Sequence, residues 1–171
     1  MKKIGMIIIL VGVMLCGCAG NIKEGRTLLE EAKYEDAKVI FEKEIQEEKH
    51  LDEAHYGKGI ACFELKEYEE AVENFEKAVL FGVEKDAVFY NFLGASYMET
   101  ARYEDAIRQY KDALALEDDG TELVQETRYN LIVAYEKSGN WDAAKKELKS
   151  YVKDYPEDTR IKRDAEFLET R

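Results

Sequence analysis

One short pattern recurs four times along the chain, an aromatic residue followed three positions later by an alanine. Its aromatic residues are Tyr34, Tyr68, Tyr103 and Trp141, which lie 34, 35 and 38 residues apart. A bulky residue follows each alanine by four positions, namely Phe41, Phe75, Tyr110 and Leu148. A fixed period of this length is typical of stacked supersecondary units, because one such unit cannot bury its apolar face alone while stacked neighbours can.

Small residues occupy two further positions of the pattern. Nine residues before the aromatic residue stands Gly25, Gly59 or Gly94, and Ile132 is the exception in the fourth segment. The alanines of the pattern are Ala37, Ala71, Ala106 and Ala144. Small side chains let two helices approach closely, so we expect the helix with the glycine to pack against the helix with the alanine. Acidic residues directly after each aromatic residue favour a helix start there, since the helix dipole stabilises them by about 0.3–1 kcal/mol each.

This pattern resembles the tetratricopeptide repeat, a helix–turn–helix unit of 34 residues. The run from Leu93 to Tyr97 matches the Leu-Gly-x-x-Tyr element of the family, and Pro156 stands at the proline position of the last repeat. The resemblance covers about residues 20–158. It implies an all-α fold, a right-handed superhelical solenoid of helix–turn–helix hairpins.

Repeat boundaries follow from the register. The four repeats span about residues 19–51, 52–86, 87–124 and 125–158. The first repeat is degenerate, because Glu44 stands where Ala78 and Ala113 stand in the second and third. Residues 159–171 carry apolar side chains at helical spacing and are expected to form a C-terminal capping helix. Those side chains are Ile161, Ala165 and Leu168.

The composition narrows the class of partner. The chain has 171 residues, of which 36% are charged and 46% hydrophobic, with a mean hydropathy of −0.49. Lysine and arginine total 25 against 37 acidic residues, which gives a net charge of −12. Binding to nucleic acid relies on a basic surface that neutralises phosphates, so the balance of charge argues against a nucleic-acid partner.

The first residues read as an export signal. A basic start, Met1 to Lys3, precedes an apolar run from Ile4 to Leu15, which is shorter than the roughly 20 residues that span a bilayer. Extended through Ala19 the run becomes a marginal span, so an uncleaved anchor stays open as the alternative. The run from Leu15 to Cys18 resembles a bacterial lipoprotein signal, in which leucine stands three residues before the lipidated cysteine and a small residue directly precedes it. Cys16 departs from that pattern, where alanine or serine is usual.

The lipoprotein resemblance implies that residues 1–17 form a signal peptide and that Cys18 becomes the lipidated N-terminus. A diacylglyceryl group there would anchor the protein to a bacterial membrane on its extracytoplasmic side, with the choice of inner or outer membrane open. Cys62 is then the one remaining free cysteine, which excludes a disulfide scaffold.

Catalytic and metal-binding motifs find no support in the sequence. His50 and His55 lie five positions apart, about 140° around a helix, and are expected to be two exposed surface residues. Cys62 falls at a packing position and is expected to be a buried, inert thiol among apolar neighbours. The sequence has no phosphate-binding loop, no dinucleotide-binding glycine pattern and no Gly-x-Ser-x-Gly. It therefore indicates no enzyme, no cofactor and no metal.

In the tetratricopeptide family, the first helices of successive repeats line a concave groove that receives peptide segments. The resemblance places nine candidate groove residues on these helices: Tyr56, Ile60, Phe63, Asn91, Ala95, Met98, Tyr129, Asn130 and Val133. The alternative is that Tyr56, Phe63 and Met98 pack between adjacent repeats. The clamp with which chaperone-binding members grip a terminal carboxylate is mostly missing. The matching places hold Ile22, Arg26, Val88 and Asn91.

The leading functional hypothesis is a lipid-anchored module that binds a protein or peptide partner in this groove. The second is a structural subunit of an envelope assembly of the outer-membrane or pilus biogenesis type. An enzyme, or a dedicated subunit of one, is the least supported.

Overall fold

A computed structural model of the chain describes residues 18–116 and 121–161, with side chains from Asn21 onward. These residues form eight helices and no strand. The helices are α1 (Cys18–Glu30), α2 (Tyr34–Gln46), α3 (Leu51–Glu64), α4 (Tyr68–Leu80), α5 (Ala87–Glu99), α6 (Tyr103–Leu114), α7 (Glu122–Ser138) and α8 (Trp141–Asp154). The expected signal peptide, the Cys18 side chain and the expected capping helix beyond Ile161 lie outside the described residues.

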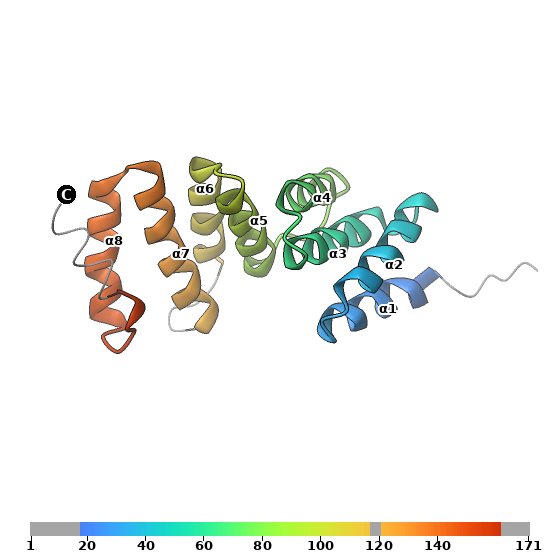
Figure 1. Cartoon of the computed structure of the whole chain (residues 1–171), viewed down its shortest axis with the longest axis horizontal. Coiled ribbons are helices and arrows are strands. Elements are labelled where there is room, and N and C mark those ends of the chain that lie inside the picture. Colours follow the sequence, from blue (N-terminus) through green and yellow to red (C-terminus); the bar gives the residue numbers. More distant parts are fainter. Residues whose placement is uncertain (1–17, 117–120, 162–171) are drawn as a thin grey trace, which may run out of the picture.

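The helices follow one another in chain order along one long axis (Figure 1). Consecutive helices pair into hairpins, and α2, α4, α6 and α8 begin at the four aromatic residues that open the repeated pattern. The predicted all-α solenoid of hairpins is therefore confirmed. None of the helices in the described ranges combines the length and the apolar character needed to cross a bilayer.

The two sets of helices differ in how they meet along the stack. The first helices of successive hairpins contact each other, α1 with α3, α3 with α5 and α5 with α7. Over the described residues, the second helices α2, α4, α6 and α8 make no such contacts among themselves. The side formed by the first helices is therefore the tighter, inner side of the curve, and a ligand on it can touch several repeats at once.

Each of the first three hairpins closes on a ring that lies against a glycine. A Cβ atom added to Gly59 would lie 2.8 Å from the Phe75 ring, and one added to Gly94 would lie 2.8 Å from the Tyr110 ring. These distances confirm the close approach that the glycine positions predict. Phe41 has a glycine on two helices, since Cβ atoms added to Gly25 and Gly57 would also collide with its ring. The sequence pattern did not single out Gly57.

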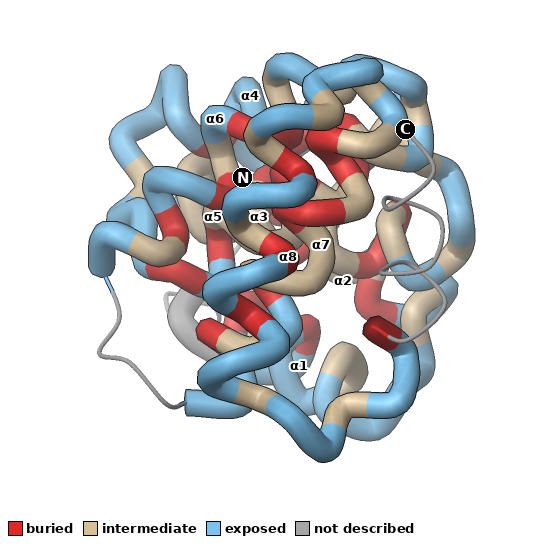
Figure 2. Tube along the Cα trace, turned by 90° about the vertical axis from the view of Figure 1, so that its left-hand side faces the viewer, coloured by how far each residue is buried: buried red, intermediate tan, exposed pale blue. Residues whose placement is uncertain are grey.

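Buried residues lie toward the middle of the stack and exposed residues on its outside (Figure 2). The buried apolar residues form two clusters, a smaller one in α1–α3 and a larger one from α3 onward. The alanines of the pattern are fully buried, as the register predicts. In the fourth hairpin the glycine and the ring are replaced by Ile132 and Leu148, which are also buried. A larger residue on the first helix thus accompanies a smaller one on the second.

The junction between the first two hairpins holds a buried carboxylate. Glu44, which stands in place of the alanines of later repeats, is fully buried. The Asn21 side-chain amide donates to one of its oxygens at 2.7 Å, and Nδ1 of the exposed His50 lies 3.1 Å from the other. A carboxylate therefore occupies a core position of the first repeat. Two polar partners compensate for the loss of water around Glu44.

His55 is buried rather than exposed, which corrects the prediction made for it. Its side chain faces α4, where Nδ1 donates to Oδ1 of Asn74 at 2.9 Å. Its ring stacks on Phe81 at 5.4 Å, with the two planes 2° apart. The sequence prediction treated the two histidines alike because both lie near a repeat boundary, but His55 falls one turn inside α3 and faces the neighbouring helix.

Protonation of His55 should destabilise the fold. Burial lowers the pKa of His55 below its usual value of 6.5, and Lys77 and Lys58 lower it further, while the bond to Asn74 opposes this. Between pH 6.5 and the lower folded pKa the unfolded chain binds more protons, so stability falls as the pH falls, by at most about 1.4 kcal/mol per pH unit. Urea denaturation at pH 7.5 and pH 5.5 measures the loss. A His55→Phe variant should lose less stability between these two pH values. An equal loss of stability in both proteins would show that His55 is not the group responsible.

Candidate functional site

A cleft of about 300 Å³ opens on the inner side of the stack, across three first helices. Phe63 reaches it from α3, and Leu123 and Asn130 reach it from α7. The remaining lining residues belong to α5 and are Val88, Asn91, Phe92 and Ala95. The wall is therefore mostly apolar, with two side-chain amides.

Helix α5 can line the cleft because it carries two apolar faces. Leu93, Gly94 and Tyr97 are buried on the side that faces α4 and α6. Val88, Asn91, Phe92 and Ala95 recur at spacings of 3, 1 and 3 on the other side. That second spacing is also one stripe of a helix. The helix begins cleanly at Ala87, since the Asp86 carboxylate accepts a hydrogen bond from the backbone N–H of Phe89 at 2.7 Å. This cap fixes the position of Val88 at the mouth of the cleft.

Aromatic contacts hold the floor of the cleft in place. The rings of Phe63 and Phe92 meet edge to face with centroids 5.5 Å apart. Phe92 also stacks on the fully buried Phe75 at 6.4 Å. Because both rings are tied to the core, the cleft is largely formed before any ligand arrives, which reduces the entropy lost on binding.

The two amides give the cleft its hydrogen-bonding capacity. Nδ2 of Asn91 donates to Oγ1 of the buried Thr127 at 2.8 Å, which leaves the Asn91 carbonyl oxygen as an acceptor. Among the described residues, the Asn130 side chain forms no hydrogen bond. An apolar recess with a few amide groups suits a peptide, whose side chain fills the recess while its backbone bonds to the amides.

The sequence-predicted groove residues divide into two groups. Phe63, Asn91, Ala95 and Asn130 come together in the cleft. The others, Tyr56, Ile60, Met98, Tyr129 and Val133, are half-buried and do not line it. Val88, Phe92 and Leu123 complete the cleft and were missed. The 3-1-3 spacing on α5 was the signal that could have identified two of them.

Tyr56 and Tyr129 are held by neighbouring side chains. The Tyr56 ring lies 5.3 Å from Phe89 and 6.1 Å from Phe75, and burial raises its pKa. The guanidinium of Arg160 lies 4.3 Å from the centre of the Tyr129 ring. Both tyrosines therefore pack within the stack, as the alternative interpretation anticipated for Tyr56.

Two models of the tetratricopeptide repeat family match the sequence, over residues 52–80 and 97–163. Together the matched segments take up more than half of the chain. They include most of α3 and all of α7, while most of α5 lies between them. The chain contains tetratricopeptide repeats. No curated protein sequence matches it significantly.

Solved structures support the same fold. YrrB, described as a tetratricopeptide protein with an unusual peptide-binding site, matches with a TM-score of 0.72 and 20% identity, covering 82% of this chain and 70% of its own. MamA of AMB-1 matches with a TM-score of 0.74 and 16% identity, and the match covers 88% of this chain and 86% of that chain. MamA of Desulfovibrio magneticus RS-1 matches with a TM-score of 0.66 and 20% identity, and the match covers 81% of this chain and 76% of that chain. At these identities the likeness establishes the fold alone.

The residues at the positions of the family's carboxylate clamp do not form such a clamp here. Ile22 is buried, and Arg26 pairs with Glu53 at 3.2 Å. Val88 and Asn91 lie in the cleft, where neither carries a positive charge.

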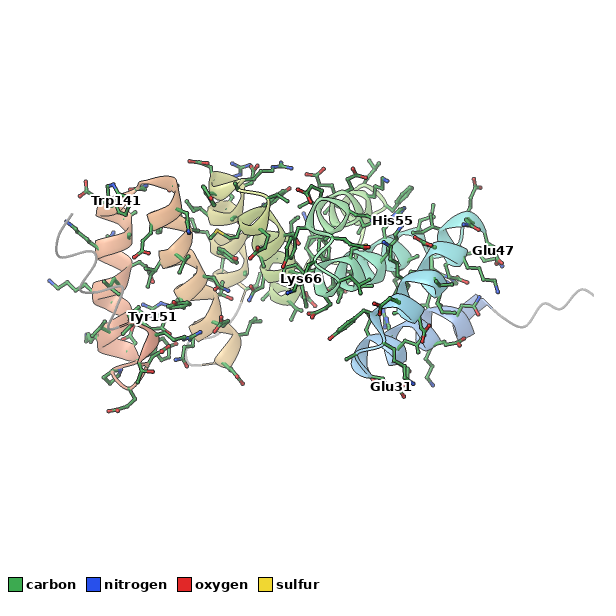
Figure 3. The ribbon with its side chains drawn as sticks, viewed as in Figure 1. Glu31, Glu47, His55, Lys66, Trp141 and Tyr151 are labelled. Carbon is green, nitrogen blue, oxygen red and sulfur yellow. The ribbon has the colours of Figure 1, made fainter. Side chains whose placement is uncertain are left out.

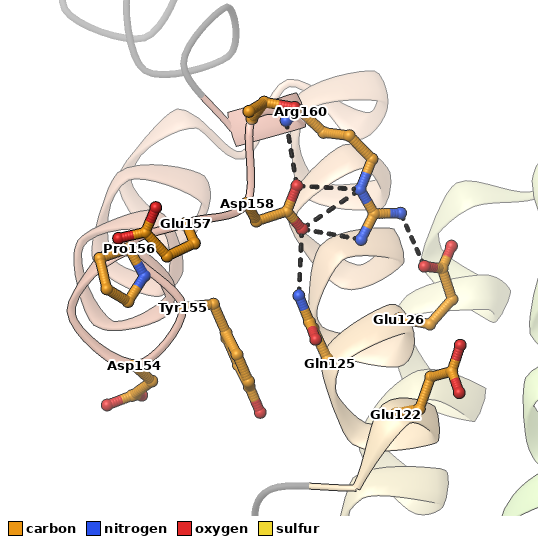
Figure 4. A pocket seen from close by; sticks show the side chains of 10 residues that line it. Glu122, Gln125, Glu126, Asp154, Tyr155, Pro156, Glu157, Asp158 and Arg160 are labelled. Carbon is orange, nitrogen blue, oxygen red and sulfur yellow. Dashed lines mark hydrogen bonds and ion pairs between the residues drawn. The ribbon is translucent and has the colours of Figure 1, made fainter.

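A larger hollow of about 800 Å³ lies at the C-terminal end of the tetratricopeptide stack (Figure 4). Its arginine binds two of its carboxylates. Arg160 contacts the Asp158 carboxylate and, at 2.7 Å, Glu126, while Gln125 and the Tyr151 hydroxyl donate to Asp158. Arg160 holds the pKa of Asp158 well below its usual range. We assign these groups to the structure of this end of the stack.

Cys62 lies beside charged side chains, which corrects the expectation of apolar neighbours. Its thiol and the carboxylates of Glu67 and Glu70 lie within 4.8 Å of one another. The ammonium group of Lys38 donates to both carboxylates, at 2.5 and 2.8 Å. Its positive charge therefore partly balances their negative charges. Burial raises the pKa of Cys62 to about 12, and Glu70 adds to the shift. The thiol is therefore protonated and unreactive near neutral pH, as a structural cysteine is.

Proposed function

We propose that the protein is a lipid-anchored interaction module at the extracytoplasmic face of a bacterial membrane, which binds a segment of a partner protein in the cleft across α3, α5 and α7. The observation that carries the proposal is the apolar cleft itself, shared by three successive first helices. Tetratricopeptide repeats are in general interaction modules, and YrrB provides a peptide-binding example of the fold. The proposed activity is binding and not catalysis.

The size and lining of the cleft suit one or two apolar side chains. Its volume lies at the lower end of the range for ligand pockets, about 300–1,000 Å³. An apolar anchor that enters such a pocket typically carries a large share of the binding energy. The amides of Asn91 and Asn130 then bond to the backbone on either side of that anchor.

A photo-crosslinker placed at the mouth of the cleft should capture the partner. Val88 is 41% exposed and lines the cleft, so benzoylphenylalanine can replace it without disturbing the core. We expect a discrete crosslinked adduct in membranes from cells that make the full chain, and mass spectrometry identifies the peptide attached.

Val39 provides the matched control, because it is 62% exposed and lies on α2, away from the cleft. Crosslinker at this position should give no adduct with the same protein. An adduct of equal yield at Val39, or none at Val88, would count against binding in the cleft.

Anchoring should depend on Cys18 and not on Cys16. The proposal rests on Leu15 three residues before Cys18 and on the small Gly17 directly before it. Two acyl chains anchor a protein stably where one does not. Cys18→Ser should abolish incorporation of labelled lipid and prevent processing, whereas Cys16→Ser should change neither. Lipid labelling that survives in Cys18→Ser would refute the anchor.

A structural role in an envelope assembly is the second candidate, and exposed apolar side chains outside the cleft favour it. Leu80 and Phe81 at the end of α4, and Leu116 after α6, are 78%, 45% and 55% exposed. None of them lines the cleft. If the assembly role is correct, partners crosslink at Leu80 and not at Val88.

A further inference from the structure

The cleft is an uncharged patch on a highly charged protein. None of its seven lining residues carries a charge, although 36% of the chain is charged. Three other hollows, of about 320 to 800 Å³, are each lined by at least three charged side chains. Charged side chains also extend outward from the turns of the stack, as at Glu31, Glu47 and Lys66 (Figure 3). A charged group that entered the cleft would lose water without gaining an opposite charge, so the cleft favours an uncharged occupant.

The lining also favours an aromatic occupant over an aliphatic one. The rings of Phe63 and Phe92 are nearly perpendicular, with their planes 82° apart. Both residues are half-buried, so each keeps part of its surface open in the cleft. A third ring in this corner can stack on one phenylalanine and meet the other edge to face. Such ring pairs contribute more than the area that they bury, which an aliphatic side chain cannot match.

Asn91 offers a hydrogen-bond acceptor in the same recess. Its Nδ2 donates to Oγ1 of the buried Thr127, so this bond fixes which way the amide points. The carbonyl oxygen has two lone pairs, one for the peptide backbone and one for a donor on the anchoring side chain. Tyrosine and tryptophan carry such a donor on an aromatic ring, and the donor usually finds a partner when the ring is buried.

We propose that the cleft selects a partner segment anchored by tyrosine or tryptophan, whose ring lies between Phe63 and Phe92 and whose O–H or N–H donates to Oδ1 of Asn91. The inference rests on the proposed binding function and adds the chemistry of the anchor. Phenylalanine has the ring but lacks the donor, and leucine lacks both.

Selection from a random peptide library displayed on phage, against the full chain in detergent, tests the inference. We expect one position of the selected peptides to hold tyrosine or tryptophan. A selected peptide is then made with tyrosine and with phenylalanine at this position, and isothermal titration calorimetry measures the affinity of each. The tyrosine form should bind about two- to tenfold more tightly, the usual effect of one hydrogen bond. Equal binding of the two forms to the unchanged protein would overturn the inference.

Substitutions of the two cleft asparagines assign the acceptor. Asn91→Leu should remove the difference between the two peptides, because leucine has a similar size but no acceptor. Asn91→Asp keeps an oxygen in the same place and should preserve the difference. Asn130→Leu is the matched control, since Asn130 lies in the same cleft and the difference should persist. A difference that persists in Asn91→Leu, or that disappears in Asn130→Leu, would overturn the role of Asn91.

The selection also separates the inference from the proposed function. Peptides with aliphatic anchors, whose binding a Val88→Glu substitution prevents, would overturn the aromatic preference and leave binding in the cleft intact. If no peptide is selected, or if Val88→Glu leaves binding unchanged, both proposals fail. A crosslink from benzoylphenylalanine at Val88 to a second copy of this chain would identify that copy as the occupant and overturn the inference.

Discussion

Phe75→Ala should lower the free energy of unfolding by about 3–5 kcal/mol, the cost of removing a large side chain from a packed core. Phe75 is fully buried, lies against the backbone of Gly59, and meets the Phe89 ring at 5.7 Å. Because Phe92 stacks on it, the truncation should also loosen the floor of the cleft. Urea denaturation followed by circular dichroism measures the change.

Leu80→Ala is the control for this substitution, since Leu80 lies in the same helix but is 78% exposed. Its effect should stay within about 0.5 kcal/mol. If Phe75→Ala were as harmless as Leu80→Ala, the ring would not be the residue that closes the second hairpin, and the assigned register would be wrong.

The sequence predicts the hairpins well because packing between their helices is set by size at fixed positions. A glycine nine residues before an aromatic residue, and a ring seven residues after it, leave one way to fit the two helices together. Gly59 with Phe75, and Gly94 with Tyr110, show that fit directly. The period therefore identifies the residues at these helix crossings as core, including Ala71 and Ala106.

The buried polar residues were harder to predict, because their burial depends on side chains of the other helix in the hairpin. Glu44 and His55 look like surface residues in the sequence, yet Asn21 and Asn74 lie where they can bond to them. Nothing in the local pattern shows that two residues 19 or 23 positions apart face each other. Such pairings follow from how the two helices of one hairpin cross, α1 with α2 and α3 with α4.

The cleft was predicted in part for a related reason. The first helices were expected to line it, and Phe63, Asn91, Ala95 and Asn130 do. Tyr56 was assigned to the same surface from its register, but its ring packs edge to face against the buried Phe89 ring of the next repeat and does not line the cleft. A repeat register shows which face of a helix points inward; it does not show which side chains the following repeat covers.

The fourth hairpin suggests a test of whether a larger side chain at the glycine position can be compensated by a smaller one at the ring position. Its first helix carries Ile132 at the glycine position and its second carries Leu148 at the ring position, both buried. Gly94→Ile alone should cost about 1–3 kcal/mol or more, because even its Cβ would lie 2.8 Å from the Tyr110 ring. Tyr110→Leu alone should cost about as much, since it leaves a cavity beside Gly94.

Combining the two substitutions should restore part of the loss, because the isoleucine occupies the space that the smaller leucine leaves. Residues in contact typically show coupling energies of about 0.5–3 kcal/mol, and we expect a favourable value in this range from the double-mutant cycle. The same cycle between Gly94→Ile and Phe41→Leu, in separate hairpins, should be additive within about 0.5 kcal/mol. Additivity for Gly94 with Tyr110 as well would mean that the two positions adjust independently. The isoleucine and leucine of the fourth hairpin would then not be an alternative packing of the same crossing.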